Sequence, residues 1–434
     1  MKLAINGGTP VRTEPFPPYV TVGSEEKEAA CRVLDSGVLS RYLGTWHEQF
    51  MGGPEVQALE QEWAAYYGVK HALAVNSCTS GLIAALGAIG IRPGDEVIVG
   101  PWSMSISATA PLFYGGIPVF ADVEPDCFCL DPASIEAKIT PRTKAILAVD
   151  LFGQPYDADV INALAKKHGL YVIEDCAQAP GASYKGRPAG TLADIGVYSL
   201  NYHKHIHCGE GGIIVTNSDA LAQRLSLIRN HAESVVEGMG VQDQTNMLGY
   251  NFRMTELDAA VARCQLKKLA DLNAKRLKNV ELLEKGLVQI PCLTMPKVRE
   301  DCKHVYYVHA CLYDEHKAGV PAKRFVEALK AELPHFRLRE KEGTKLGVGY
   351  AKPLYFLPIF QTVDQHATGI PQRDLHTSYA KGICPECEKL HEGGCIFSEF
   401  MLPSLEPEDV ADVVAAYVKV YQNRMELNAT HTTF

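Results

Sequence analysis

Seven short apolar runs alternate with helical stretches between residues 71 and 217, and this alternation limits the folds that are open to the chain. The runs are His71–Val75, Glu96–Val99, Pro118–Ala121, Ala145–Val149, Leu170–Ile173, Asp194–Leu200 and Gly212–Asn217. Strands that alternate with helices form a mostly parallel sheet with helices on both faces. We therefore predict an α/β fold built on a mostly parallel seven-stranded sheet flanked by helices.

The chain has 434 residues, which is more than one ordinary domain holds. We predict an extended N-terminal arm over residues 1–23, a large domain over 24–280 and a smaller α+β domain over 281–434. Residues 361–397 are rich in His, Gly, Pro and Cys. An irregular insertion is therefore predicted within the smaller domain.

Composition limits the compartment and the partners. The formal net charge of −9 argues against nucleic acid as the main partner. The 13 cysteines are an odd number and are scattered, which suits reduced thiols in the cytoplasm better than a disulfide framework. No signal-peptide pattern opens the sequence, and no apolar run reaches about 18 residues. We therefore expect a cytoplasmic protein that neither enters nor crosses a membrane.

One cysteine pair has the spacing of a metal or redox site. Cys384 and Cys387 form a CxxC motif, with His391 and Cys395 close behind. A structural zinc site needs four well-spaced ligands, and a redox CxxC needs a thioredoxin-like setting. Plain buried cysteines are the simpler interpretation, so no metal site is predicted.

Three polar clusters follow predicted strands: Ser77-Cys78-Thr79, Glu174-Asp175 with Gln178, and Ser199 through Lys204. Binding sites in sheets of this kind lie at the carboxyl ends of the strands, so these clusters are expected to meet. The first opens a helix, whose free N–H groups and hydroxyls suit a phosphate. A simple helix cap would explain any one cluster, but three at one edge favour a composite site.

Lys204 is the candidate nucleophile. It lies among His203, His205 and His207, just before a Gly-Glu-Gly-Gly turn. A lysine forms a Schiff base with an aldehyde only when part of it is neutral, which requires desolvation or nearby positive charge. The flanking strands could provide the first and the histidines the second. Read alone, Lys204 could equally be a solvated surface charge, and the roles of the histidines stay open.

Further motifs occur in order along the chain. They are Ala4–Arg12, Pro93–Val99, Glu174–Ala179, Gly209–Gly212, Gly249–Met254, Lys352–Leu354 and Leu402-Pro403. With Lys204 between them, they resemble the sugar aminotransferases of the DegT/StrS family, which are pyridoxal-phosphate enzymes of the aspartate-aminotransferase fold type I. The resemblance covers nearly the whole chain, and several ordered matches are far more specific than any one motif.

The resemblance implies a pyridoxal 5'-phosphate site in the large domain. Lys204 would bind the cofactor as a Schiff base, Asp175 would pair with the pyridine nitrogen, and Gln178 would contact the 3-oxygen of the ring. Cys78, Thr79 and Ser199 would hold the phosphate. Asn251 would reach the cofactor phosphate of a neighbouring subunit, which implies a homodimer with shared active sites.

Some positions depart from the family pattern. The residue that stacks on the cofactor ring aligns best with Met104, and Trp102 is the alternative. Glycine is common in the family where Cys78 stands here. Family histidines of the substrate region fall at Asp150 and Tyr355, which leaves the substrate open.

The implied activity is transfer of an amino group from glutamate or glutamine to a ketosugar or nucleotide-linked ketosugar, by way of the pyridoxamine phosphate form. A keto-cyclitol acceptor of an aminoglycoside pathway is the alternative, and the insertion with Cys384 and Cys387 resembles that branch. A sugar dehydratase of the same family would lack Lys204, commonly replaced by histidine. A non-catalytic regulator would lack Lys204 or Asp175.

Overall fold

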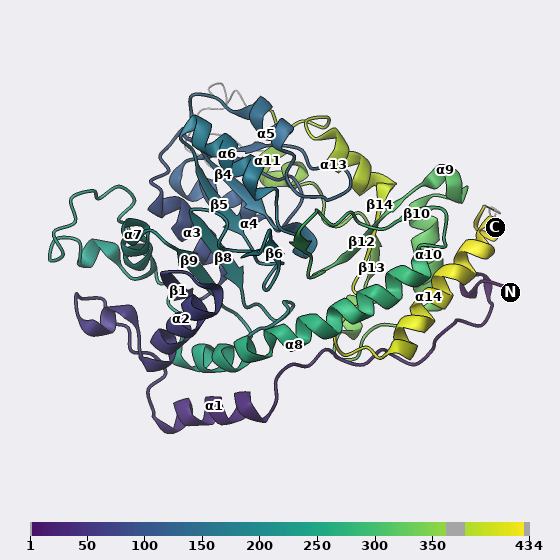
Figure 1. Ribbon diagram of the computed structural model, residues 1–434, viewed down its shortest axis with the longest axis horizontal. Helices are drawn as coiled ribbons and strands as arrows, with labels where there is room; N and C mark the ends of the chain where they lie inside the picture. Colours follow the sequence, from purple (N-terminus) through teal and green to yellow (C-terminus); the bar gives the residue numbers. More distant parts are fainter. Residues whose placement is uncertain (1, 362–377, 429–434) are drawn as a thin grey trace.

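The large sheet has seven strands in the order β1-β9-β8-β5-β4-β2-β3 (Figure 1). The computed structural model describes residues 2–361 and 378–428. The strands are β1 His71–Val75, β2 Glu96–Val99, β3 Ile117–Phe120, β4 Thr143–Val149, β5 Tyr171–Asp175, β8 Ile195–Ser199 and β9 Gly212–Thr216. β9 is antiparallel to β1 and β8, while the other neighbours pair in parallel. The predicted mostly parallel seven-stranded sheet is confirmed.

Helices cover both faces of this sheet. They are α2 Pro54–Tyr67, α3 Cys78–Ala88, α4 Ile106–Thr109, α5 Pro132–Lys138, α6 Ala158–His168 and α7 Asp219–Arg229. Several begin after a residue whose side-chain oxygen accepts a first-turn N–H, which is what favours a helix start there. These capping residues are Ser77 of α3, Asp131 of α5, Asp157 of α6 and Ser218 of α7.

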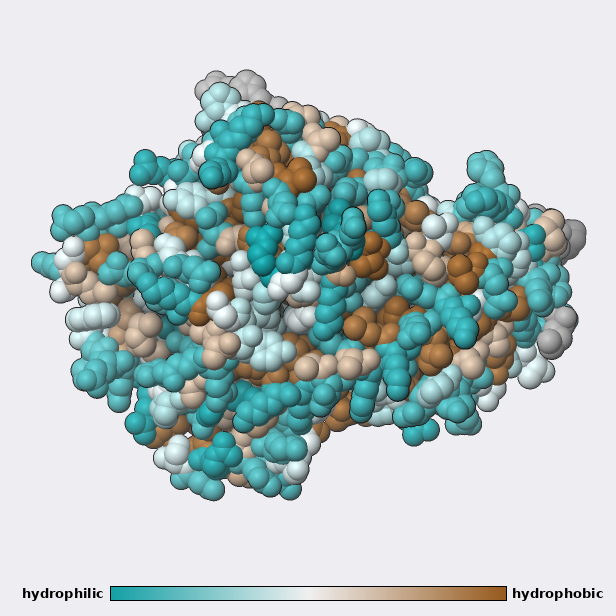
Figure 2. Space-filling view, in the orientation of Figure 1, coloured by the Kyte–Doolittle hydropathy of each residue, from teal (hydrophilic) through white to brown (hydrophobic). Residues whose placement is uncertain are grey.

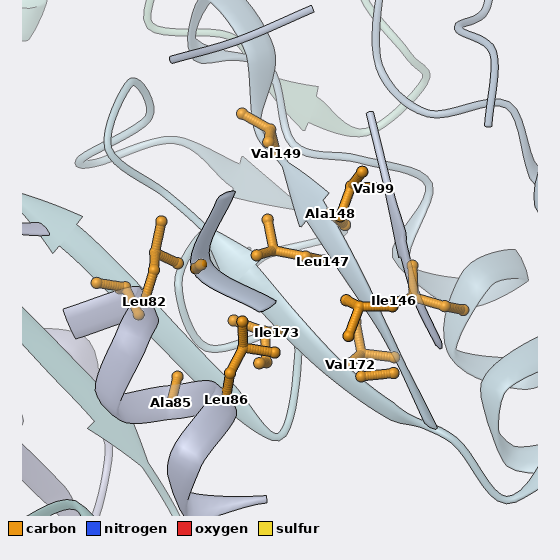
Figure 3. Close-up of a cluster of buried hydrophobic side chains, with 14 of the residues drawn as sticks. Leu82, Ala85, Leu86, Val99, Ile146, Leu147, Ala148, Val149, Val172 and Ile173 are labelled. Atoms are coloured by element: carbon orange, nitrogen blue, oxygen red, sulfur yellow. The ribbon is translucent and has the colours of Figure 1, made fainter. Parts of the chain in front are cut away.

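The sheet separates two apolar cores, as the edge strand β1 illustrates. Leu73 and Val75 belong to one core, whereas Ala72 and Ala74 belong to the other, because successive side chains of a strand point to opposite faces. Figure 3 shows part of the first core, where Leu82 and Leu86 of α3 lie against side chains of β4 and β5. This packing fixes the N-terminus of α3 just beyond the carboxyl end of β1.

A long helix, α8 Glu256–Leu287, joins the two parts of the molecule (Figure 1). Thr255 caps it by accepting the N–H of Asp258. The predicted domain boundary at residue 280 falls within this helix. α1 Ser24–Asp35 packs along α8, and so does α14 Pro407–Gln422.

The second sheet is antiparallel, with the order β10-β12-β14-β13. Its strands are β10 Leu293–Thr294, β12 His309–Tyr313, β13 Leu346–Val348 and β14 Cys395–Ser398, and α9 Glu315–Ala318 and α10 Ala322–Glu332 belong to the same part. Two short helices that follow β13, α11 Pro358–Gln361 and α13 Pro385–Lys389, place Phe360 and Cys387 in the core of the large sheet. A third small sheet joins β6 Ser183–Tyr184, β7 Arg187–Pro188 and β11 Cys302–Lys303.

The predicted insertion over 361–397 extends too far. Residues 395–397 belong to β14, which pairs with β12 on one side and β13 on the other. Cys395 and Ile396 are buried there, so these residues are core rather than insertion. Residues 362–377 of the predicted insertion lie outside the described residues.

The N-terminal arm runs along the smaller part of the molecule before reaching α1 (Figure 1). Phe16 is fully buried and its ring packs on Phe336 and Phe400. The carboxylate of Glu332 accepts the N–H groups of Ala4 and Val11. The arm is therefore held by specific contacts.

The outer surface is mostly hydrophilic on the face shown in Figure 2. Within the described ranges, no helix is both long enough and apolar enough to span a membrane. All thirteen cysteines lie in these ranges, and each is a free thiol.

Candidate active site

A cavity of about 470 Å³ opens where the strands of the large sheet end. Seven of the predicted site residues line it: Cys78, Thr79, Met104, Asp175, Gln178, Ser199 and Lys204. Two tyrosines from the second part of the molecule, Tyr307 and Tyr350, complete its wall. The three polar clusters that the sequence placed at separate strand ends thus share one cavity.

The N-terminus of α3 forms one end of the cavity. Ser77 caps the helix by accepting the N–H of Ser80 at 3.0 Å, so Cys78 and Thr79 lie in the first turn, where N–H groups have no intrahelical partner. Gly212 makes the approach possible, since a Cβ there would lie 2.7 Å from the backbone nitrogen of Cys78. These N–H groups and the positive end of the helix dipole suit an anion.

Asp175 lies at the end of β5 and is 3% exposed. Its Oδ1 accepts the N–H of Ala177 at 3.1 Å and faces the Cys78 thiol at 3.9 Å, while Oδ2 accepts the hydroxyl of Ser107 at 3.0 Å. Burial raises the pKa of Asp175, and these hydrogen bonds with the charge of Lys204 oppose that shift. A cationic group beside the carboxylate would keep it ionised.

Lys204 is held in a tight loop after β8. Its N–H donates to the carbonyl of Asn201 at 2.9 Å, and Tyr202 N–H donates to the carbonyl of Gly209 at 3.0 Å. The side chain is only 8% exposed, and Nζ lies 4.3 Å from the centroid of the Tyr307 ring. Lys204 is therefore a desolvated amine inside the cavity rather than a solvated surface charge.

The neighbouring histidines are a poor source of positive charge. Burial lowers the pKa of His203, of His207 and, most strongly, of His205, so the neutral rings are favoured. His205 is fully buried, with Nε2 3.1 Å from the carbonyl of Val305. Only His203 lines the cavity. The histidines therefore do not supply the nearby positive charge that the sequence suggested for Lys204.

A strained turn links Gln178 to Tyr307. Phe152 adopts a left-handed backbone with φ 61°, its N–H donates to Gln178 Oε1 at 2.7 Å, and its carbonyl accepts the N–H of Tyr307 at 2.7 Å. A Cβ on Gly153 would lie 2.9 Å from the backbone nitrogens of Tyr306 and Tyr307, so only glycine fits. With Oε1 occupied, the amide NH₂ of Gln178 is the group left for a ligand.

Trp102 was predicted as an alternative ring-stacking residue, and the structure places it elsewhere. Its indole is 2% exposed and does not line the cavity, and Nε1 donates to the carbonyl of Ala351 at 2.6 Å. A buried indole N–H needs such a partner. Met104 does line the cavity and is 63% exposed, which leaves it as the candidate to cover a planar ligand.

Asn251 does not line the cavity of its own chain. It is exposed, and its Oδ1 accepts a hydrogen bond from Arg253 Nε at 2.8 Å. Its carbonyl accepts from Asn76 Nδ2 at 3.3 Å, which ties it to the turn before α3. It therefore lies on the surface near the anion-binding end of the cavity.

The cysteine motif and the two substituted family positions lie outside the cavity. Cys384, Cys387 and Cys395 are buried, and none of them belongs to a cluster of metal-ligand geometry among residues 2–361 and 378–428. Tyr355 is buried, with its hydroxyl bound to Glu388. Asp150 is buried beside Glu174 and Cys176, the one cluster of such geometry in the described part.

Three residues of the site were not predicted from the sequence: Ser107, Tyr307 and Tyr350. Ser107 follows the segment that carries Met104, and its hydroxyl has no sequence signal of its own. The two tyrosines are 43 positions apart and reach the cavity only through the packing of the second sheet.

Comparison with known proteins identifies the family of the chain. A family model described as the DegT/DnrJ/EryC1/StrS aminotransferase family matches residues 44–417. The spore coat polysaccharide biosynthesis protein SpsC of Bacillus subtilis (strain 168) is 38% identical over 73% of this chain and 81% of its own length. An L-glutamine:2-deoxy-scyllo-inosose aminotransferase of Streptoalloteichus tenebrarius is 34% identical over 98% of this chain and 99% of its own length.

Solved structures resemble the whole fold. An aminotransferase from Psychrobacter cryohalolentis superposes with a TM-score of 0.80 at 30% identity, over 94% of this chain and 99% of that chain. DesI, studied in the presence of its TDP-sugar product, has a TM-score of 0.80 at 27% identity, over 99% of this chain and 98% of that chain.

Proposed function

The chain belongs to the DegT/DnrJ/EryC1/StrS aminotransferase family and is a pyridoxal-phosphate-dependent aminotransferase of fold type I, and we propose that it aminates a ketosugar or nucleotide-linked ketosugar. One observation supports this proposal above the others. Lys204, Asp175 and the N-terminus of α3 face one cavity, so an amine, a carboxylate and an anion site are available to a single ligand.

The cavity fits the cofactor by the chemistry of its groups. The first turn of α3, with Cys78 and Thr79, would receive the phosphate, and Ser199 would assist. Asp175 would pair with the ring nitrogen, and the amide NH₂ of Gln178 would donate to the ring oxygen. Lys204 would be the point of covalent attachment.

Bound pyridoxal phosphate supplies an aldehyde that accepts an amino group and a ring that withdraws electrons from the reacting carbon. The protein supplies position, charge and proton transfer. Asp175, held by Ala177 N–H and Ser107, would present a fixed negative charge to the ring nitrogen. Lys204 Nζ, once free, would carry a proton from the donor carbon to the cofactor carbon C4′, and from C4′ to the acceptor carbon in the second half of the cycle.

We propose glutamate or glutamine as the amino donor. The acceptor follows from the relatives, which act on sugars and cyclitols. DesI binds a TDP-sugar product, which supports a nucleotide-linked ketosugar. A keto-cyclitol is the second candidate, because relatives named as 2-deoxy-scyllo-inosose aminotransferases match nearly the whole chain.

We also propose a homodimer that works in the cytoplasm. Asn251 supports the dimer, since it is exposed near the phosphate end of the cavity and is free to face a second copy of the chain. The thirteen free thiols support a reducing compartment.

The test begins with the purified protein and pyridoxal phosphate. We expect visible absorbance that bleaches when glutamate or glutamine is added, followed by transfer of the amine to an acceptor. Keto-forms of nucleotide sugars and of cyclitols would be supplied separately, with the products identified by mass spectrometry. A product that has lost a hydroxyl group without gaining an amine would indicate a dehydratase instead. Absence of cofactor binding would indicate a non-catalytic protein.

A further inference from the structure

Two tyrosines form a wall of the cavity, and neither of them is among the residues that would hold the cofactor. Tyr307 precedes β12 and Tyr350 follows β13, so both come from the second part of the molecule. The groups that suit the cofactor, from Cys78 to Lys204, all come from the large sheet and its loops. The tyrosines therefore stand where a substrate would enter between the two parts.

The hydroxyl groups of this pair have no partner within residues 2–361 and 378–428, although other tyrosines of the chain do. Tyr19 donates to the carbonyl of His205 at 2.6 Å, and Tyr379 donates to the carbonyl of Pro118 at 3.0 Å. Neither Tyr307 nor Tyr350 is among the side chains whose polar atoms are sealed from solvent without a partner. Their hydroxyls therefore keep some exposure to solvent, and both residues line the cavity.

Packing fixes both rings. Tyr350 meets Phe152 and Phe397 edge-on, with ring centroids 5.0 Å and 5.9 Å apart. Tyr307 is held through its N–H, which donates to the carbonyl of Phe152, and its ring face is covered by Lys204 Nζ. Burial raises the pKa of both phenols, so each remains a neutral group that can donate and accept. Because both rings are already fixed, their hydroxyls can bind a ligand with little loss of side-chain conformational entropy.

We propose that Tyr307 and Tyr350 select the acceptor by hydrogen bonding to hydroxyl groups of the ketosugar or cyclitol ring. This inference rests on the proposed function and assigns the substrate-recognition wall within the same cavity. The amino donor has no hydroxyl groups on its carbon chain, whereas the acceptor ring has several, so the wall is expected to contribute more to acceptor binding than to donor binding.

The experiment compares Tyr307→Phe and Tyr350→Phe with the parent, and Tyr66→Phe is the matched control. Tyr66 lies on α2, is 46% exposed and does not line the cavity. Each protein is loaded with pyridoxamine phosphate, and binding of inositol, glucose and thymidine-diphosphate glucose is measured by calorimetry. These probes carry hydroxyl groups but no ketone, so they bind without reacting. Thermal melting checks that each variant is folded.

We expect each cavity variant to weaken binding of the probe preferred by the parent by roughly 2- to 13-fold, the value of one neutral hydrogen bond. Bleaching of the pyridoxal phosphate form by glutamate or glutamine should fall by a smaller factor than probe binding, because the donor has no hydroxyl groups on its carbon chain. The control should match the parent in both measurements.

Three results would overturn the proposal. Unchanged probe binding in both variants would show that the hydroxyls are idle. Equal losses in donor bleaching and probe binding would show that the tyrosines position the cofactor or Lys204. A parent that bleaches with donor but binds no probe would show that this wall does not recognise hydroxyl groups. A parent that fails to bleach at all would instead count against the proposed aminotransferase function.

Discussion

Ser107 donates its hydroxyl to Asp175 Oδ2 at 3.0 Å, beneath the cavity. The other oxygen of Asp175 accepts the N–H of Ala177, so both oxygens are held although the carboxylate is buried. Burial raises the pKa of this carboxylate in spite of those hydrogen bonds, and a cationic ligand is what would keep it charged. The charge of Asp175 is therefore linked to the occupancy of the cavity.

Asp175→Asn should leave the fold intact and cut transamination severely. The amide keeps the shape of the side chain but cannot stabilise a positive ring nitrogen equally. By analogy with other lost charge-stabilising contacts, kcat should fall on the order of 10² to 10⁴. Steady-state kinetics and thermal melting would be measured together. Retained activity with a collapsed melting temperature would mean that Asp175 is only structural. Ser107→Ala should also lower kcat, but by less than Asp175→Asn.

Lys204→Ala should abolish the visible absorbance of the bound cofactor and turnover. Lys204 is the lysine that lines the cavity, and its side chain is almost fully removed from solvent. Lys185→Ala is the control, because Lys185 is exposed and pairs with Asp159. Spectra of both variants after loading with pyridoxal phosphate make the comparison. Turnover at the parent rate by Lys204→Ala would refute the assignment.

Trp102→Phe should destabilise the fold beside Tyr350 and leave cofactor binding intact. The change removes the indole N–H and leaves the carbonyl of Ala351, next to Tyr350, without its donor. A buried carbonyl left unpaired costs about 1–3 kcal/mol, and this one is partly buried, so the free energy of unfolding should fall by at most that order. Denaturant unfolding would measure it. The visible spectrum of the loaded enzyme should persist, whereas loss of cofactor binding would mean that Trp102 contacts the ring after all.

Asp150 and Glu174 should make stability depend on pH. Both are fully buried, and burial raises the pKa of each carboxyl, with the two groups reinforcing one another at Asp150. The folded chain therefore keeps protons that the unfolded chain releases. The contribution of Glu174 to stability is fully present below about pH 4.5 and is lost as the pH rises through about 7. The pKa of Asp150 is also raised well above its usual value, so Asp150 contributes in the same direction.

Asp150→Asn tests this origin. Asparagine keeps an oxygen for the N–H of Tyr156, which Asp150 Oδ1 now accepts at 3.0 Å, and it carries no proton to lose. Melting temperatures across this pH range should then fall less steeply than in the parent. An unchanged slope would show that other groups cause the pH dependence.

The sequence predicted what local patterns determine and missed what tertiary packing determines. Asp175 directly follows an apolar run, so its place at the end of β5 was readable from the chain. Trp102 is an aromatic residue two positions before Met104, which aligns with the ring-stacking residue of the family. Only the fold shows that the indole N–H of Trp102 is bound to the carbonyl of Ala351. β14 looked irregular because glycines and cysteines surround it, and its pairing with β12 and β13 overrides that composition.

The last prediction is that Asn251 completes the active site of a neighbouring subunit. A helix cap explains it poorly, since Thr255 caps α8 and the Asn251 side chain binds Arg253. The test mixes two inactive proteins, Lys204→Ala and Asn251→Trp, the second chosen to block the phosphate of the neighbour. In a mixed dimer one site would combine Lys204 from one chain with Asn251 from the other. Random pairing of equal amounts should restore about a quarter of the parent activity.

Exchange of subunits would be followed independently, by native mass spectrometry of chains that differ in mass. The matched control mixes Lys204→Ala with Asp175→Asn, because both residues line the same cavity of one chain and no intact site can form. Activity in the first mixture and none in the second would support a shared site. No recovery in the first mixture, despite demonstrated exchange, would show that each chain builds its site alone.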